Sequence, residues 1–359
     1  MQGKLETSLR FGWTTGTCAT AATYAAYMAM VTGEFPQSVK IDTPSGKTAE
    51  LRIHSSRVSS TGWMAGVIKD AGDDPDVTHG AEIRATLCPG EAGEGVSFHG
   101  GEGIGMVTKS GLPIEVGQPA INPVPRQMMT DIIANLSQEL EGPADVRVTI
   151  SVPGGEALAG KTWNPRLGIV GGISILGTTG VVRPFSCSAW IASIHRGIDV
   201  ARANGLTHVA GSTGATSETA FLKQYDLPEI ALLDMGDFVG GMLKYLRRHP
   251  VPRLTIAGGF AKMVKLAQGH GDLHSARSQI DFASLADTAA ELGMDHSAVA
   301  GANSALDVLG MATPSQRKTL AEVIARKALY QAKALLRSDD VKIDIMVVDR
   351  GGEILAEAF

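Results

Sequence analysis

The sequence has few cysteines, few aromatic residues and little excess charge, and each scarcity argues against a class of function. Its three cysteines, Cys18, Cys88 and Cys187, are odd in number and lack the ligand spacing of a metal site. Aromatic residues make up 5% of the 359 residues, so few rings are present on which nucleic-acid bases could stack. A net charge of −5 at pH 7 argues against nucleic acid or an anionic membrane as the main partner, because both select dense positive charge.

Long hydrophobic runs are also missing. The longest strongly apolar stretch, around Ile169–Leu176, is short and broken by glycine, so it cannot span a bilayer. The first ten residues lack the apolar centre of a signal peptide. We therefore expect a reduced, cytoplasmic protein that binds neither a membrane nor nucleic acid.

Glycine, in contrast, is abundant. The chain has 43 glycines in 359 residues, about 12% against a typical ~7%, and they gather in turns rather than in low-complexity stretches. Because glycine lets the backbone approach a ligand closely, this pattern favours a protein that holds its ligand largely with backbone groups.

The length exceeds the usual size of one core, so we expect two domains, 1–160 and 161–359. The first is predicted to be α+β. Its helices are expected over Thr17–Val31, ended by Gly33, and over Arg126–Leu140, with short strands between them. Thr14, Thr15 and Thr17 would lie at the N-terminus of the first helix, where free N–H groups can bind an anion.

The second domain is predicted to be an open, Rossmann-like and mostly parallel α/β sheet. Short apolar runs are each followed by a turn and a helical pattern, which is typical of parallel strands joined by crossover helices. The runs are Ile169–Leu176, Thr207–Ala210, Ile230–Leu233 and Leu254–Ala257. A long helix is expected from the capping box Thr313–Gln316, then a last strand over Lys342–Val348 and a short tail. The fold class is therefore α/β.

The run Ile68–Gly80 concentrates charge. Asp70, Asp73, Asp74 and Asp76 lie with His79 within ten positions. One interpretation is an Asp-Pro turn whose side chains cap local N–H groups. The other is a cluster of carboxylates and an imidazole at a reaction centre, which would repel an anion and attract a cation. A calcium loop is disfavoured, because the alternate ligands and the distal glutamate are absent.

Three glycine-bearing turns follow predicted strands of the second domain: Gly177–Gly180, Gly211–Gly214 and Gly258-Gly259. Open α/β sheets bind ligands beyond the carboxyl ends of their strands, so we expect a ligand crevice there. Ordinary turns are the alternative. Neither a phosphate loop nor a nucleophile elbow is present in the sequence.

Several runs, taken together, resemble the CbiD family of cobalt-precorrin-5B C1-methyltransferases, from the cobalt-early route to vitamin B12. The runs that carry the resemblance are 10–19, 68–80, 107–112, 116–126, 161–169, 172–180 and 258–267. The resemblance implies methylation of C-1 of cobalt-precorrin-5B to cobalt-precorrin-6A, with S-adenosylmethionine as methyl donor. It also implies that cobalt arrives with the substrate, so no protein-bound metal is expected.

We assign roles to residues of these runs as hypotheses. Asp73, Asp74 and His79 are predicted to be catalytic. The residues predicted to bind substrate carboxylates are Lys69, Lys109, Arg126, Lys161, Arg166 and Arg183. The residues predicted to bind the donor are Gly177, Thr178, Thr179, Gly180, Gly211, Ser212, Thr213, Gly214, Gly258 and Gly259. A bulky residue at Gly180 is expected to weaken donor binding with little change in the fold.

Two other functions stay open at this stage: a non-catalytic tetrapyrrole carrier and a nucleotide-dependent small-molecule transferase. Beyond the tetrapyrrole substrate, the expected partners are other copies of the chain and, transiently, neighbouring enzymes of the pathway.

Overall fold

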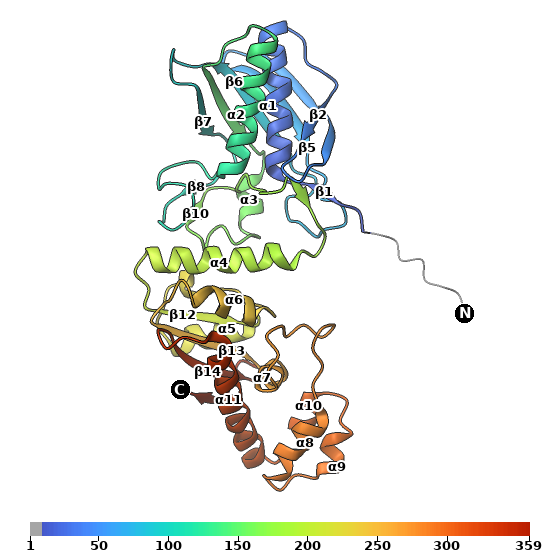
Figure 1. Cartoon of the computed structure of the whole chain (residues 1–359), viewed down its shortest axis with the longest axis vertical. Coiled ribbons are helices and arrows are strands. Elements are labelled where there is room, and N and C mark those ends of the chain that lie inside the picture. Colours follow the sequence, from blue (N-terminus) through green and yellow to red (C-terminus); the bar gives the residue numbers. More distant parts are fainter. Residues whose placement is uncertain (1–8) are drawn as a thin grey trace, which may run out of the picture. The chain divides into compact units, whose positions relative to one another are not determined.

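The structure is a computed structural model that describes residues 9–359. The chain divides into two compact units, Met1–Ser186 and Cys187–Phe359, here called unit 1 and unit 2 (Figure 1). Among the helices of residues 9–359, none combines the length and the apolar character that crossing a bilayer requires.

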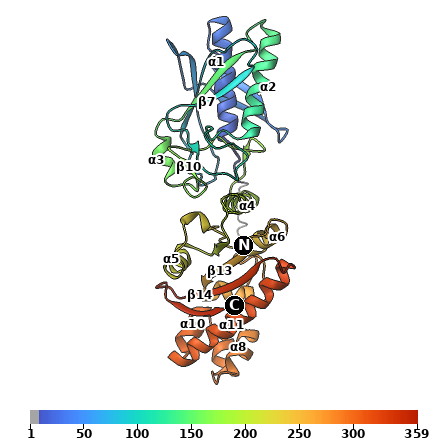
Figure 2. The same cartoon turned by 90° about the vertical axis from the view of Figure 1, so that its left-hand side faces the viewer.

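Unit 1 is a mostly antiparallel sheet with two helices on it. Its elements are β1 (Gly12–Trp13), α1 (Thr15–Thr32), β2 (Ser38–Asp42), β3 (Thr48–Arg52), β4 (Ser55–Ser59), β5 (Gly62–Ile68), β6 (Glu82–Pro89), β7 (Val96–Gly100), β8 (Met106–Val107), α2 (Pro123–Glu139), β9 (Val146–Ser151), α3 (Gly155–Ala159), β10 (Ile169–Val170) and β11 (Val181–Val182). The main sheet has the order β4-β5-β6-β9-β7, and only β7 and β9 run parallel. Helices α1 and α2 pack side by side, and α1 contacts β5 and β6 (Figures 1 and 2).

Helix α1 is the centre of this core because its sequence is built for close packing. Its alanines are fully buried, so the backbone of the helix approaches the sheet and α2 closely. The Thr14 hydroxyl accepts a hydrogen bond from the N–H of Thr17 and caps the start, and Gly33, with φ of 83°, ends the helix. The expected helix over Thr17–Val31 is confirmed.

Unit 2 is a parallel sheet covered on both faces. Its elements are α4 (Cys187–Ala203), β12 (His208–Ser212), α5 (Ala215–Gln224), the 3₁₀ helix η1 (Glu229–Ala231), α6 (Val239–Leu246), β13 (Arg253–Gly259), α7 (Phe260–Ala267), α8 (Phe282–Ala290), α9 (His296–Ala300), α10 (Ala305–Met311), α11 (Pro314–Leu336), β14 (Lys342–Val348) and β15 (Ile354–Ala358). The order is β12-β13-β14-β15, with the first three strands parallel and β15 antiparallel to β14. One core lies under α6, α7 and α11, and a smaller one lies under α5. The α/β class, with an α+β first part and a mostly parallel second part, is confirmed.

Two predicted strands of this sheet are wrong. Ile230 and Ala231 of the predicted strand Ile230–Leu233 belong to the 3₁₀ helix η1, and in the described chain only Leu232 forms a β-bridge, with Ala210. Ile169–Leu176 lies in unit 1, where β10 pairs with β8 and Ile175 bridges to Ile121. Strand β15, in contrast, was expected only as a tail. Local sequence patterns mark a stretch as extended but do not tell which sheet it joins.

The division into compact units falls after Ser186, 26 residues beyond the predicted boundary at 160 (186 − 160 = 26). The intervening residues complete unit 1, since β10 pairs with β8 and β11 pairs with β1. As a statement about independently folding domains, the boundary at 160/161 stays a prediction.

Candidate functional site

The aspartate-rich loop is built around a buried ion pair. Lys69 is 1% exposed, and its ammonium donates to Asp76 Oδ2 over 2.7 Å. The other carboxylate oxygen of Asp76 accepts hydrogen bonds from the N–H and the hydroxyl of Thr78, at 2.7 and 2.6 Å. Burial alone would raise the pKa of Asp76, but the Lys69 ammonium beside it lowers that pKa overall. Lys69 therefore holds the loop in place, and its predicted contact with substrate stays a prediction.

A second contact ties the loop to the start of the described chain. The Arg10 guanidinium donates to both oxygens of Asp70, and its hydrogen bond to that carboxylate lowers the pKa of Asp70 to about 2. Asp70 Oδ1 also accepts from the N–H of Gly72 over 2.9 Å. Asp70 and Asp76 thus cap local N–H groups, as the turn interpretation predicted for this loop.

The three predicted catalytic side chains lie on the outside of this framework. Asp73 accepts a hydrogen bond from the backbone N–H of Arg10 at 2.6 Å, and Asp74 accepts one from the N–H of Phe185 at 2.8 Å. His79 Nδ1 accepts from the N–H of Ala71 at 3.1 Å, and its side chain is more than half exposed. The carboxylates and the imidazole are therefore near solvent, but each already accepts a backbone hydrogen bond. Their catalytic role stays a prediction.

Four of the runs that carry the family resemblance, 107–112, 116–126, 161–169 and 172–180, meet in a second region of unit 1. Segments 104–122 and 164–176 interleave through the pairing of β8 with β10 and through the bridges Ile104–Ile173 and Ile121–Ile175. Asn164 and Ser174 are buried there. Asn164 donates to Gly172 O at 3.0 Å, and Ser174 donates to Asn164 Oδ1 at 3.2 Å. Segments 104–122 and 164–176, far apart in sequence, thus pack together through strand pairing and buried hydrogen bonds.

Predicted substrate-binding cations belong to the same unit, but they differ in availability. The Lys109 side chain packs against Gly168, and its ammonium has no ion-pair partner among residues 9–359. Arg126 is half-buried at the start of α2, where it donates to Ile121 O at 2.8 Å, and burial lowers its pKa. Lys161 and Arg183 are exposed, and Arg166 is half-buried. The structure brings these residues into unit 1 but does not test what they bind.

The turn Gly177–Gly180 does not lie where it was expected. It belongs to unit 1 and packs on the N-terminus of α1: Thr14 N and Thr17 Oγ1 both donate to Gly180 O, at 3.1 and 2.8 Å. The N–H of Gly16 donates to Leu176 O at 3.0 Å, so the expected anion site at this helix N-terminus is wrong. A Cβ at Gly180 would lie 2.6 Å from Thr43 Cβ, and φ there is +78°. A bulky residue would strain the fold, which contradicts the expected mild effect.

The other predicted turns do lie at the carboxyl edge of the unit 2 sheet. Strand β12 ends at Ser212 and leads through Thr213-Gly214 into α5, and β13 ends at Gly258-Gly259, where α7 begins. No side chain caps either helix, and a Cβ at Gly214 or Gly259 would meet no atom of the described chain within 4 Å. The buried Ser212 hydroxyl has no hydrogen-bond partner in that part of the chain. Open helix N-termini and a free hydroxyl can bind an anionic or polar ligand.

Sequence reasoning missed further polar residues beside this edge. Asp349 follows β14, and its Oδ1 accepts the N–H groups of Gly351 and Glu353 at 2.8 and 2.9 Å. Asp237 forms an ion pair with Lys262 of α7, and the N–H of Gly236 donates to Ser212 O. The position directly after a predicted strand could have identified Asp349. Nothing in the local sequence indicated the pairing of Asp237 with Lys262.

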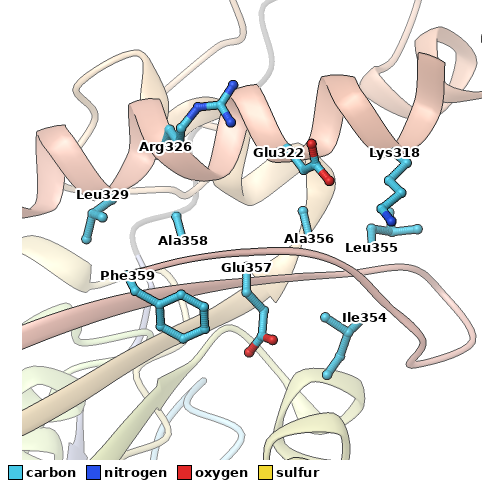
Figure 3. Close-up of a pocket in the computed structure, with 10 residues that line it drawn as sticks. All are labelled: Lys318, Glu322, Arg326, Leu329, Ile354, Leu355, Ala356, Glu357, Ala358 and Phe359. Carbon is cyan, nitrogen blue, oxygen red and sulfur yellow. The ribbon is translucent and has the colours of Figure 1, made fainter. Parts of the chain in front are cut away.

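A surface groove lies elsewhere, along α11 and the edge strand β15 (Figure 3). Its volume is about 480 Å³, and its walls include Lys318, Glu322 and Arg326. No predicted site residue lines it. Within residues 9–359, no three His, Cys, Asp or Glu side chains are placed to hold a metal ion together. That the protein binds no metal of its own stays a prediction.

The geometry defines a two-unit α/β protein with an interlocked, cation-bearing unit 1 and an open carboxyl edge in unit 2. The CbiD family profile matches residues 2–184, and the profile "CbiD, C-terminal domain" matches 272–359. Two proteins named cobalt-precorrin-5B C(1)-methyltransferase are close relatives. The one from Brucella anthropi is 58% identical over 98% of this chain and 96% of its own length, and the one from Paramagnetospirillum magneticum is 56% identical over 98% and 99%. A crystal structure of the cobalamin biosynthesis protein cbiD from Archaeoglobus fulgidus matches with 28% identity and a TM-score of 0.42, covering 75% of this chain and 83% of that one. The chain belongs to the CbiD family.

Proposed function

We propose that the protein methylates C-1 of cobalt-precorrin-5B, with S-adenosylmethionine as donor, to give cobalt-precorrin-6A in cobalamin biosynthesis. The observation that carries this proposal is the sequence identity of 58% and 56% to two relatives named cobalt-precorrin-5B C(1)-methyltransferase, over nearly the full length of all three chains. The alignment with these relatives covers both units of the chain, so the units proposed to bind the donor and the substrate are both present.

We assign the donor to the carboxyl edge of the unit 2 sheet. The residues there fit such a molecule, because two uncapped helix N-termini open onto free space and Ser212 presents an unused hydroxyl. Ser212, Thr213 and Gly214 would hold its polar groups, with Gly259 leaving the backbone accessible and the buried Gly258 packing against Thr213. When bound, the donor supplies an electrophilic methyl group on a sulfonium.

The tetrapyrrole substrate is assigned to unit 1. It carries several carboxylates, and an acidic protein must meet them with locally placed cations. Lys161 and Arg183 are the best placed by exposure, and Lys109, Arg126 and Arg166 lie half-buried in the same unit. Each such contact contributes about 1.5–3 kcal/mol when it is formed by a charged group.

Methyl transfer to carbon requires mainly that the reactants be held in line. Positioning of this kind can lower the barrier by up to ~7–11 kcal/mol. The chain's own contribution at the reacting centre is assigned to Asp73, Asp74 and His79, which would stabilise positive charge or accept a proton at a carboxylate or imidazole.

Titration with S-adenosylmethionine separates this function from its rivals. A tetrapyrrole carrier should bind a corrinoid and ignore the donor, whereas a nucleotide-dependent transferase should prefer ATP or NAD. Formation of a methylated product from cobalt-precorrin-5B would support the proposal directly. Absence of product, with the corrinoid bound and the donor not bound, would favour the carrier.

The catalytic assignment has its own test in Asp73→Asn, Asp74→Asn and His79→Gln. Asparagine keeps the oxygen that accepts the N–H of Arg10 or Phe185, so the loop should hold its shape. If the loop is catalytic, turnover should fall at least ~10²-fold at a near-native melting temperature. Wild-type turnover in all three folded variants would leave the loop with a structural role alone.

A further inference from the structure

The two-stranded ribbon β8–β10 is apolar on both faces. Val107 and Ile169 are paired and point inward, where they are buried with Ile114. Met106 and Val170 are paired in the same way on the outer face and are 42% and 58% exposed. A ribbon with one solvated face normally carries polar residues there, so this exposed cross-strand pair indicates a ligand or partner.

The surroundings of the pair limit what can cover it. Val116, also exposed, lies in the adjacent turn, whose Gly117 N–H donates to Val107 O at 2.8 Å. Lys109 extends from the end of β8 along Gly168, with its ammonium unpaired in the described part of the chain. Glu115 precedes Val116 in this turn and carries a charge opposite to that of Lys109. The occupant must therefore have an apolar body and an anionic edge on the Lys109 side.

We propose that the outer face of the β8–β10 ribbon, formed by Met106, Val170 and Val116, is the platform on which one flat face of the tetrapyrrole lies. This inference rests on the proposed function and adds the apolar contact to it. The macrocycle matches the two requirements, because its ring is apolar and its carboxylates lie at the rim, within reach of a lysine on the flank. Gly171, directly after Val170, has φ of +84° and no described atom near a Cβ position, so the platform has free space at that end.

The test measures binding of cobyrinic acid, a stable cobalt corrinoid with free carboxyl groups, by titration calorimetry. Met106→Gln combined with Val170→Thr removes the apolar surface without altering a buried residue. We expect the Kd to rise at least about tenfold, because the apolar contacts of both side chains with the ring are lost. Binding of S-adenosylmethionine should be unchanged.

Matched variants make the result specific. Val58→Thr, at another exposed valine of unit 1 in β4, should leave the Kd within about twofold of wild type. Lys109→Gln should weaken corrinoid binding and reduce its dependence on salt, whereas Glu115→Gln should strengthen it.

Two results would overturn the inference while the proposed function stands. One is a wild-type Kd in the folded double variant. The other is a change of oligomeric state by light scattering with the Kd unaltered, which would mean that a second copy of the chain covers the ribbon. If the wild-type protein neither bound the corrinoid nor methylated cobalt-precorrin-5B, the proposed function itself would fail, and the inference with it.

Discussion

Two glycine turns with nearly the same sequence have different positions in the molecule. Gly177-Thr-Thr-Gly180 and Gly211-Ser-Thr-Gly214 each follow an apolar run and precede a helix. The first packs on the N-terminus of α1, and its carbonyl groups accept hydrogen bonds from Thr14, Thr17 and Ser45. The second ends β12 at the carboxyl edge of the unit 2 sheet and leaves the start of α5 uncapped.

The difference shows what makes such a turn available to a ligand. In unit 1 the chain itself supplies the hydrogen-bond partners that a ligand would otherwise supply. In unit 2 the turn lies at the carboxyl edge of the sheet, where no side chain caps the start of α5 and a Cβ at Gly214 would meet no described atom within 4 Å. A glycine-rich turn is therefore informative only with the position of its strand in a sheet.

The largest effect is expected from Gly180→Val, which tests whether the turn in unit 1 is packed while the turn in unit 2 is open. The new side chain would meet Thr43 and Thr17 within 3 Å, and it would have to adopt a φ of +78°. Strain and overpacking together should lower the free energy of unfolding by about 4 kcal/mol. Thermal denaturation of the purified variant measures this loss. A melting temperature within a few degrees of wild type would show that the turn is not packed as described.

A second test asks whether the ion pair in the aspartate-rich loop of unit 1 stabilises the fold. Asp76→Asn leaves the buried ammonium of Lys69 without its counter-charge. Breaking a buried pair on one side costs about 3–5 kcal/mol, and the 27% exposure of Asp76 places this one at the lower end. Chemical denaturation of Asp76→Asn beside Asp73→Asn is the measurement. Equal stability of the two variants would contradict the structural role of Asp76.

The sequence predicted elements defined by local chemistry. The capping threonine and Gly33 determine α1, and the box Thr313–Gln316 begins α11 as expected. The turns Gly211–Gly214 and Gly258-Gly259 were placed correctly because βα units are local. The sequence could not predict that Ile169–Leu176 pairs within unit 1 or that Lys69 is buried, since both depend on residues distant in the chain.

Gly214→Ala tests the open turn. A Cβ at this position meets no described atom within 4 Å, and φ of 163° is extended backbone that alanine adopts readily. Stability should therefore change by less than ~0.5 kcal/mol, as for other unstrained surface sites. If the donor binds here, the added methyl group should raise its Kd about tenfold, or ~1.4 kcal/mol. Unchanged S-adenosylmethionine affinity in this variant would argue that the donor lies away from α5.

The last expected effect is a pH dependence at the opposite, amino edge of the unit 2 sheet, where β12 begins. His208 is buried in β12, and its Nε2 lies 2.8 Å from Thr255 Oγ1. Burial, with Arg253 nearby, lowers the pKa of His208 from its ordinary value of 6.5 to about 4. The unfolded chain therefore binds more protons than the folded one between these values. The stability contributed by the neutral imidazole is complete above about pH 6.5 and is lost as the pH falls toward 4, with a slope of at most ~1.4 kcal/mol per pH unit.

Melting temperatures of wild type and His208→Gln from pH 7.5 to 4.5 measure this loss. Glutamine can keep the hydrogen bond to Thr255 but does not titrate, so its curve should fall less steeply. The carboxylates whose pKa values are lowered, Asp70, Asp76, Glu82 and Asp145, act equally in both proteins and cancel in the difference. His99→Gln, at an exposed histidine of β7, should follow wild type. Parallel curves for wild type and His208→Gln would mean that His208 is protonated in the folded protein as readily as in the unfolded chain.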